Sequence, residues 1–346
     1  MTNKIKNRYN RIAGLYDLMD APMVAMFSQR RKQMLEAASA KTLEVGVGTG
    51  INIASYPSHV DLTGIDFSEK MIEKAMNVTA DSIIFDLEDS VSLAEKDQAR
   101  INVARAVSRL KETGKETIVR VNAMDSFFGI QDLISIVEKR PNTILVPKAD
   151  EKSLGMADML ITNLEERYGL GKGSIRMLPL LETSYSIVNA YKILGVSKRI
   201  NGVQLGAEDL TKELGTVRTR VGDEIQYARN AIVYAGCARG IDIIDTPYTG
   251  IGDEEGLVFD TERAKSLGMT GKTCIHPDQI DTINQLFTPH PKAVEEARKI
   301  IAAFNTAVSE GKGACMHEGK MIDNPVAVRA MKLVEKADLI AAFNTN

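Results

Sequence analysis

The stretch SIIFDLEDSVSLAEKDQARINVARAVSRLKETGKETIVRVN, residues 82–122, decides the fold. It begins with a short apolar run, continues with a segment whose apolar residues recur every three or four positions, and ends with a second apolar run. A helix between two strands carries the chain back to the starting edge of the sheet, so the two strands pair in parallel. The stretch therefore predicts an α/β protein built on a parallel sheet.

The same alternation of apolar run and helix-like segment continues along the chain. The candidate strands, in order, are SIIFDL, TIVRVN, TILVPK, IRMLPLLE, GVQLGAED, IDIIDT and GKTCIH. Nearly continuous apolar strands indicate a sheet that is buried on both faces. A closed (β/α)8 barrel needs eight strands, and VDLTGID at residues 60–66, followed by the helix-like SEKMIEKAMN, supplies the eighth. We therefore predict a (β/α)8 barrel, with an open doubly wound sheet as the alternative.

The composition excludes several classes of protein. With 346 residues, 44% hydrophobic and 26% charged, and a net charge of −3, the chain resembles an ordinary globular enzyme and offers no nucleic-acid surface. No signal-peptide core or membrane-length apolar run is present, which predicts a cytoplasmic protein. The three cysteines lack metal-type spacing, and Cys237, in an apolar helix-like segment, is expected in the core. The four histidines are scattered, and His276 in CIHPDQI is expected to cap a turn.

Charged side chains follow the ends of five successive candidate strands. They are Asp86, Glu88 and Asp89, then Arg120, Lys148 and Glu182, then Glu208 and Asp209. Any one of them has a structural explanation, because charged residues are common where a strand meets solvent. In a parallel barrel, however, the carboxyl ends of the strands meet on one rim, where active sites lie. Five such strand ends in a row favour an active site on that rim.

The residue types indicate the chemistry of this site. Glu182 and Asp209 offer only oxygen atoms, which suit Mg²⁺, an ion that binds through one or two carboxylates and keeps several waters. Arg120 carries a planar guanidinium that matches a carboxylate with two hydrogen bonds. A divalent ion beside an arginine suits a substrate in which a carboxylate adjoins an oxygen, such as a 2-oxo acid.

Eight motifs in order carry a family resemblance over about residues 71–340. They are FDLEDSVSLAEKDQAR, VRVNAMDS, VPKAD, PLLETS, LGAEDLTKELGTVRT, DTPY, GMTGKTCIHPDQI and GKMIDNP. Together they resemble the citrate lyase β subunits, which are citryl-thioester lyases of the HpcH/HpaI aldolase superfamily and adopt the (β/α)8 barrel. The resemblance implies cleavage of a citryl thioester, carried on acyl carrier protein or coenzyme A, to oxaloacetate and an acetyl thioester.

The resemblance also implies roles for particular residues. The family's Mg²⁺ ligands match Glu182 of PLLET, which also meets the substrate, and Asp209 of GAED. The arginine that binds the substrate carboxylate matches Arg120 of VRVN. The aspartate of GKMID, here Asp323, would act as an acid–base group over a neighbouring subunit's pocket. Asp86 of DLED, with Asp89, would orient Arg120 and the metal-bound waters.

The first part of the chain resembles a different family. RYNRIAGLYDLMDAP, TLEVGVGTGINIASYP and VDLTGIDFSEKMIEKA look like the start of a class I S-adenosylmethionine methyltransferase. Glu44 and the glycines Gly46, Gly48 and Gly50 match the cofactor loop of that family, and Asp66 stands where an acid accepts the ribose hydroxyls. The match ends near residue 77, so the resemblance implies a truncated, Rossmann-like βαβ fragment.

These observations combine into one expected organisation. Residues 1–57 form the truncated methyltransferase-like segment, residues 58–290 the lyase barrel, and residues 291–346 a C-terminal helical extension that carries the GKMID loop. The resemblance implies a homotrimer, in a complex with citrate lyase α and γ (acyl carrier protein) subunits. A malyl- or citramalyl-CoA lyase of the same superfamily is the first alternative. An S-adenosylmethionine-binding remnant beside an inactive barrel is the second.

Overall fold

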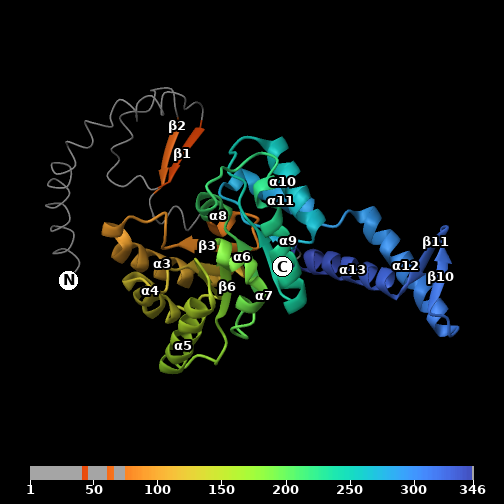
Figure 1. The fold of residues 1–346 in the computed structure, drawn as a ribbon, viewed down its shortest axis with the longest axis horizontal. Helices are drawn as coiled ribbons and strands as arrows, with labels where there is room; N and C mark the ends of the chain where they lie inside the picture. Colours follow the sequence, from red (N-terminus) through yellow and green to blue (C-terminus); the bar gives the residue numbers. More distant parts are fainter. Residues whose placement is uncertain (1–40, 46–60, 66–74, 345–346) are drawn as a thin grey trace. The chain divides into compact units, whose positions relative to one another are not determined.

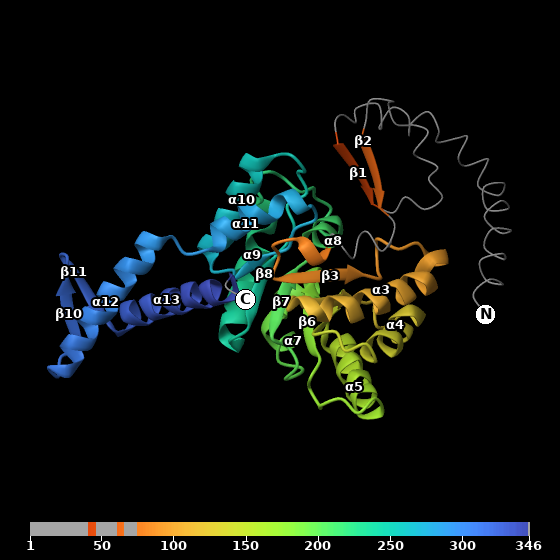
Figure 2. The ribbon, with the colours of Figure 1, turned by 180° about the vertical axis from the view of Figure 1, so that it is seen from behind.

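The fold is that of a computed structural model, which describes residues 41–45, 61–65 and 75–344 (Figures 1 and 2). The chain divides into two compact units. The first comprises residues 1–146 and 156–176, and the second comprises residues 147–155 and 177–346.

Seven strands form the main sheet, in the order β3-β4-β5-β6-β7-β8-β9. They are β3 (Ser82–Asp86), β4 (Glu116–Arg120), β5 (Thr143–Val146), β6 (Arg176–Leu181), β7 (Gly202–Leu205), β8 (Asp242–Asp245) and β9 (Gly271–Lys272). The strand pairs β3–β4, β4–β5, β6–β7, β7–β8 and β8–β9 are all parallel. These are the seven strands that the apolar runs predict, so the parallel α/β architecture is confirmed.

Burial explains why the middle positions of the longer strands are mostly apolar. All four residues of β5 and all four of β7 are buried. In β6 only the first residue, Arg176, is exposed. A strand in a parallel sheet is covered on both faces, so its apolar residues do not alternate with polar ones.

The helices of the two units alternate with these strands, as predicted. They are α3 (Lys96–Leu110), α4 (Phe127–Val137), α5 (Glu151–Arg167), α6 (Ser184–Val188), α7 (Ala190–Ile193), α8 (Ala207–Glu213), α9 (Gln226–Arg239), α10 (Glu254–Leu267) and α11 (Ile280–Phe287). Short 3₁₀ turns lie at Leu93–Glu95, Lys111–Thr113, Asp223–Ile225 and Pro277–Gln279. No helix of the described residues has both the length and the apolar character needed to cross a membrane.

The expected eighth barrel strand belongs to another sheet. Within residues 60–66, β2 (Asp61–Ile65) pairs in parallel with β1 (Lys41–Val45), and these two strands form a separate two-stranded sheet. Among the described residues, β3 rather than β2 is therefore the first strand of the main sheet, and the predicted closure through residues 60–66 is wrong. The predicted cofactor loop with Gly46, Gly48 and Gly50, and also Asp66, lie outside the described residues.

The C-terminal extension contains two helices and a hairpin. Helices α12 (Pro291–Ser309) and α13 (Asn324–Asn344) lie side by side in both ribbon views, with the antiparallel pair β10 (Ala314–His317) and β11 (Lys320–Asp323) at one end (Figures 1 and 2). The GKMID segment is thus a strand rather than the expected loop. The turn before it has positive φ at Glu318 and Gly319 (47° and 77°), which suits a two-residue hairpin. Phe304, Ile322 and Ala327 form a small core there.

Two single-residue expectations have opposite outcomes. Cys237 is exposed rather than buried, so the prediction that it lies in the core is wrong. Helix α9 packs on β7 and β8 with its other face, which includes Ile232 and Gly236, and position 237 points away from them. The His276 prediction is confirmed: its Nδ1 accepts a hydrogen bond from the Asp278 amide and caps the following 3₁₀ turn.

Candidate active site

Asp86 and Arg120 form an ion pair in the first unit. They are register partners at the last positions of β3 and β4. Arg120 Nε donates to Asp86 Oδ1 at 2.7 Å and Nη2 donates to Oδ2 at 2.6 Å, so the carboxylate is bound by two parallel hydrogen bonds. Arg120 Nη1 lies 3.3 Å from Glu88 Oε2. The Nη1–Nη2 edge of the guanidinium keeps N–H groups that Asp86 does not use, enough to bind a second carboxylate.

The pair shifts the pKa values of both groups. Burial by itself would raise the pKa of the Asp86 carboxyl, but the hydrogen bond and charge of Arg120 outweigh it, and the pKa is lowered. Burial likewise opposes the charge of Arg120, whereas its contact with Asp86 raises the pKa of the guanidinium. Both side chains therefore stay charged at neutral pH.

A buried network holds the chain that follows β3. Lys96 Nζ donates to the carbonyl oxygens of Leu87 and Glu88 at 2.7 and 2.6 Å. Asn122 Nδ2 donates to Leu87 O at 2.8 Å and to Asp132 Oδ2 at 2.7 Å. The Asp132 carboxylate is wholly buried. Because the Glu88 amide also binds Asp86 Oδ1, at 2.9 Å, this network fixes the carboxylate that holds Arg120.

A second cluster, Lys148, Glu182 and Asp209, lies in the second unit. We call it the carboxylate cluster. Its members follow three successive strands: Lys148 comes after β5, Glu182 directly after β6, and Asp209 in the first turn of α8 after β7. Glu182, 5% exposed, accepts a hydrogen bond from the Lys148 amide through Oε1 at 2.7 Å. Lys148 Nζ lies 3.5 Å from Asp209 Oδ2.

Backbone conformation shapes this cluster. Lys148 has φ 48°, a left-handed conformation that is uncommon for a residue with a side chain, and its N–H binds Glu182 in that conformation. Gly206 lies against the same carboxylate. A Cβ atom at Gly206 would lie 2.5 Å from Glu182 Cβ and 2.7 Å from Oε2, so only glycine leaves room for this side chain.

The carboxylate cluster contains the donor types that a hard divalent cation prefers. Glu182 and Asp209 supply only oxygen donors, as Mg²⁺ prefers. Glu182 packs against Gly206, so its carboxylate keeps this position only because residue 206 has no side chain. These two residues are therefore the ones that could hold Mg²⁺, while Lys148 contributes positive charge beside Asp209.

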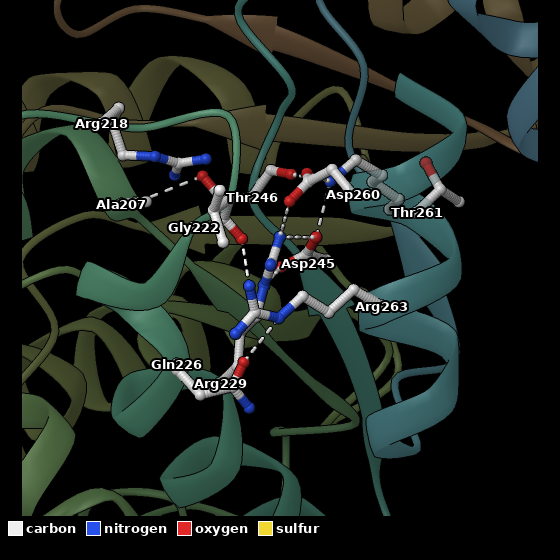
Figure 3. A network of polar contacts seen from close by, with 12 residues as sticks. Ala207, Arg218, Gly222, Gln226, Arg229, Asp245, Thr246, Asp260, Thr261 and Arg263 are labelled. Carbon is white, nitrogen blue, oxygen red and sulfur yellow. Dashed lines mark hydrogen bonds and ion pairs between the residues drawn. The ribbon is translucent and has the colours of Figure 1, made fainter. Parts of the chain in front are cut away.

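Four charged residues form a buried network at the ends of β8 and β9 (Figure 3). Arg229, from α9, binds Asp245 through two hydrogen bonds of 2.9 and 2.7 Å and Asp260 through one of 2.7 Å. Lys272 Nζ lies 2.6 Å from Asp245 and 2.7 Å from Asp260. Burial would raise the pKa of Asp260, but Lys272 and Arg229 outweigh it and lower that pKa. The four charges of this buried network are therefore paired with one another.

Asp89 also acts on Arg120, because its negative charge helps to raise the pKa of that guanidinium. Asp89 and Glu208 are exposed. Asp323 is the last residue of β11, and its Oδ1 accepts a hydrogen bond from the Val326 amide in the first turn of α13 at 3.2 Å. The carboxylate thus caps that helix, as an N-terminal aspartate commonly does.

Sequence reasoning missed the residues that support these groups. Lys96 lies in a helix, and Asn122 was not singled out although it follows Arg120 by two positions. Asp245 and Lys272 end candidate strands, as Asp86 and Arg120 do, and they are also register partners. A charged residue at the last position of two neighbouring apolar strands is the signal that would have found this pair.

Comparisons place the chain among proteins of known class. Residues 66–277 match the family described as HpcH/HpaI aldolase/citrate lyase. A citrate lyase subunit beta from Haemophilus influenzae is 40% identical over 269 residues, which cover 77% of this chain and 92% of that protein. An L-malyl-CoA/beta-methylmalyl-CoA lyase from Cereibacter sphaeroides is 32% identical over 307 residues, which cover 83% of this chain and 96% of that protein.

The fold is also similar to that of protein CitE from Mycobacterium tuberculosis, whose crystal structure contains magnesium, acetoacetate and coenzyme A. It aligns with a TM-score of 0.62 and 26% identity, covering 87% of this chain and 99% of that chain.

Proposed function

Because the chain belongs to the HpcH/HpaI aldolase/citrate lyase family and is a carbon–carbon lyase, we propose that it cleaves a citryl thioester, with Mg²⁺, to oxaloacetate and an acetyl thioester. The observation that carries the proposal is the carboxylate cluster, in which Glu182 and Asp209 offer the oxygen donors that the ion requires. The 40% identity to a citrate lyase subunit beta supports the citryl substrate. The magnesium in a related structure supports the choice of ion.

Glu182 and Asp209 are the residues proposed to hold Mg²⁺ and to position the substrate hydroxyl and its neighbouring carboxylate. When bound, the ion would supply Lewis-acid stabilisation to the oxygen of the forming oxo-acid carbonyl. Glu182 is kept in place by the Lys148 amide, which reduces the freedom of its carboxylate. Lys148 Nζ would also attract an anionic substrate toward Asp209.

Arg120 is proposed to bind a carboxylate of the oxo-acid part of the substrate. Asp86 takes the Nε–Nη2 edge of the guanidinium, and Nη1 lies 3.3 Å from Glu88 Oε2, so the substrate would use the remaining N–H groups of the Nη1–Nη2 edge. A guanidinium held by Asp86 cannot rotate freely, and a fixed donor pair keeps the breaking bond aligned. Asp86 is in this sense a positioning residue.

Asp323 is proposed as the acid–base group. Cleavage of the bond between the hydroxyl-bearing carbon and the acetyl CH₂ turns the hydroxyl into a carbonyl, and the hydroxyl proton would pass to a water molecule. The bonding electrons go to the acetyl thioester as an enolate, which needs a proton on carbon. A protonated Asp323 carboxyl would donate it.

The partners follow from the same relatives. The thioester would be carried on acyl carrier protein or coenzyme A, and the citrate lyase relatives support a complex with α and γ subunits. We further propose a homotrimer in which Asp323 serves a neighbouring subunit, and a domain boundary at residues 290/291; the expected boundary at 57/58 would separate the paired strands β1 and β2. A malyl- or citramalyl-CoA lyase is the alternative, supported by the 32% identity to such an enzyme.

A panel of thioesters tests the substrate. The purified full chain is supplied with citryl-CoA, malyl-CoA or citramalyl-CoA, and the oxo acid released is identified by mass spectrometry, with Mg²⁺, with EDTA, and with Mg²⁺ restored. We expect oxaloacetate from citryl-CoA, abolished by EDTA and recovered with Mg²⁺. Faster release of glyoxylate or pyruvate would favour the alternative, and EDTA-resistant cleavage would contradict the metal.

A second activity for the N-terminal segment has one supporting observation. The parallel pairing of β1 and β2 is the pairing that a βαβ nucleotide-binding unit requires. We propose S-adenosylmethionine as its ligand. Equilibrium dialysis of the full chain with labelled S-adenosylmethionine tests this, and retention no greater than with albumin would contradict it.

A further inference from the structure

We propose that Glu296, His317 and Glu318 form a second metal site, suited to Zn²⁺, in the C-terminal extension. Glu296 comes from α12, His317 ends β10, and Glu318 begins the hairpin turn. Each residue offers one ligand atom, and these atoms all lie within 4.8 Å of one another. The inference rests on these residues alone and does not depend on the lyase assignment.

The environment of His317 Nε2 is the observation that points to an ion. This nitrogen is buried, and among the described residues it has no hydrogen-bond partner. A buried polar atom without a partner is costly and rare. Glu296 Oε1 lies 3.5 Å from this nitrogen, longer than the usual 2.7–3.2 Å of an N–H···O bond.

A bound zinc ion would account for this separation. Zinc lies about 2.0–2.1 Å from a histidine nitrogen and about 2.0–2.2 Å from a carboxylate oxygen. At a tetrahedral angle these bonds place the nitrogen and the oxygen about 3.4 Å apart. The His317–Glu296 distance is therefore close to that of two ligands of one ion.

The donor set distinguishes this site from the carboxylate cluster. An imidazole nitrogen with two carboxylate oxygens suits Zn²⁺ and similar transition metals, whereas Mg²⁺ prefers oxygen alone. The Glu296 side chain is 42% exposed and Glu318 is exposed, so an ion can enter from solvent. Three protein ligands leave a fourth position for water.

An ion here would fasten the hairpin to the helix. Two of its ligands belong to the β10–β11 hairpin and one belongs to α12. Asp323 ends the same hairpin, five residues after Glu318 in the sequence. We infer that zinc stabilises the segment that carries Asp323.

Zinc titration of the full chain tests the site. After chelation and desalting, Zn²⁺ is titrated calorimetrically in buffer with excess Mg²⁺, and Co²⁺ absorption reports the ligand geometry. We expect one Zn²⁺ per chain, with at least about a tenfold loss of affinity in His317→Gln and in Glu296→Gln. Zn²⁺ should raise the melting temperature of the wild type but not of either variant.

Two control variants show whether a loss of Zn²⁺ affinity is specific to this site. Glu295→Gln, one position away on α12, should bind Zn²⁺ like the wild type. Glu182→Gln should also keep this site, because it alters only the carboxylate cluster. Circular dichroism confirms that each variant is folded before titration. Equal Zn²⁺ affinity in the wild type, His317→Gln and Glu296→Gln would overturn the proposal, as would binding without defined stoichiometry.

Discussion

At the scale of single residues, a pair of opposite charges at the ends of two neighbouring strands occurs twice in the sheet. Asp86 with Arg120, and Asp245 with Lys272, are register partners at the last positions of neighbouring strands, and each pair is joined by hydrogen bonds. Arg120 is 23% exposed, whereas Lys272 is wholly buried. A partly exposed cationic side chain can contact a substrate, whereas a buried one can only stabilise the fold. Exposure thus separates the candidate binding group from the structural one.

The Asp86–Arg120 pair should make stability depend on acid pH. Because the folded pKa of Asp86 lies below its usual 3.8, the stabilisation is complete above that value and is lost as pH falls through the lower, folded pKa. Asp86→Asn should therefore lose about 1–3 kcal/mol of unfolding free energy at pH 7. The difference from the wild type should shrink below about pH 3.8. Urea denaturation at several pH values measures it.

The matched control is Asp97→Asn, which alters an exposed partner of Arg100. Its effect should stay within about 0.5 kcal/mol. A pH-independent difference between Asp86→Asn and the wild type would contradict the ion-pair account.

Gly206 offers a probe of the carboxylate cluster that changes no ligand. In Gly206→Ala the new methyl group would lie 2.7 Å from Glu182 Oε2, so the carboxylate must move. We expect the Mg²⁺ concentration for half-maximal activity to rise about 10–100-fold. Gly155→Ala, in α5 with nothing within 4 Å of the added Cβ, is the control and should leave it unchanged. Unchanged Mg²⁺ dependence in Gly206→Ala would count against the site.

At the scale of elements, the repeated strand–helix units could be predicted from the sequence, whereas the C-terminal hairpin and the pairing of β2 could not. Six of the seven main strands could be predicted because each holds an apolar run between helices, whereas β9 is only the pair Gly271–Lys272. The β10–β11 hairpin could not, because only one residue of its two four-residue strands is buried and they show no apolar run. The strand at residues 61–65 was recognised, but its pairing with β1 depends on contacts distant in sequence.

The buried network of Arg229, Asp245, Asp260 and Lys272 should be the costliest polar feature to break. Lys272→Met leaves two buried carboxylates with one cation, and removing one partner of a buried pair costs about 3–5 kcal/mol. Lys312→Met removes an exposed partner of Glu310 and should change stability by less than about 0.5 kcal/mol. Urea denaturation compares the two. A loss in Lys272→Met no larger than in the control would show that the network contributes little.

At the scale of the whole molecule, Arg120 belongs to the first compact unit, whereas Glu182, Asp209 and Asp323 belong to the second. Single strand ends suggested Arg120, Glu182 and Asp209 because parallel strands bring their carboxyl ends to one edge. The supporting residues Lys96, Asn122 and Arg229 were not predictable in this way, since each reaches its partners through tertiary folding. Sequence therefore predicts which residues bear charge at strand ends better than it predicts what holds them.

Subunit mixing tests the proposed trimer. Glu182→Gln and Asp323→Asn should each be nearly inactive alone. If Asp323 serves a neighbouring subunit, random mixing in equal amounts after dissociation should restore about one quarter of wild-type activity. The reason is that an active site needs a native Glu182 from one subunit and a native Asp323 from its neighbour, and about half of the subunits supply each. Light scattering checks that the mixed species is trimeric. No recovery on mixing, with trimers formed, would place Asp323 at the site of its own subunit or at none.

The central proposal is that Glu182 and Asp209 hold a Mg²⁺ ion for carbon–carbon bond cleavage. The most direct measurement is Mg²⁺-dependent release of oxaloacetate from citryl-CoA by the wild type, Glu182→Gln and Asp209→Asn, with a parallel titration of Mn²⁺ followed by its electron paramagnetic resonance. We predict one Mn²⁺ bound per wild-type chain. In each variant we predict loss of that binding and at least about a hundredfold loss of turnover. Near-normal turnover with unchanged Mn²⁺ binding in both folded variants would contradict the account.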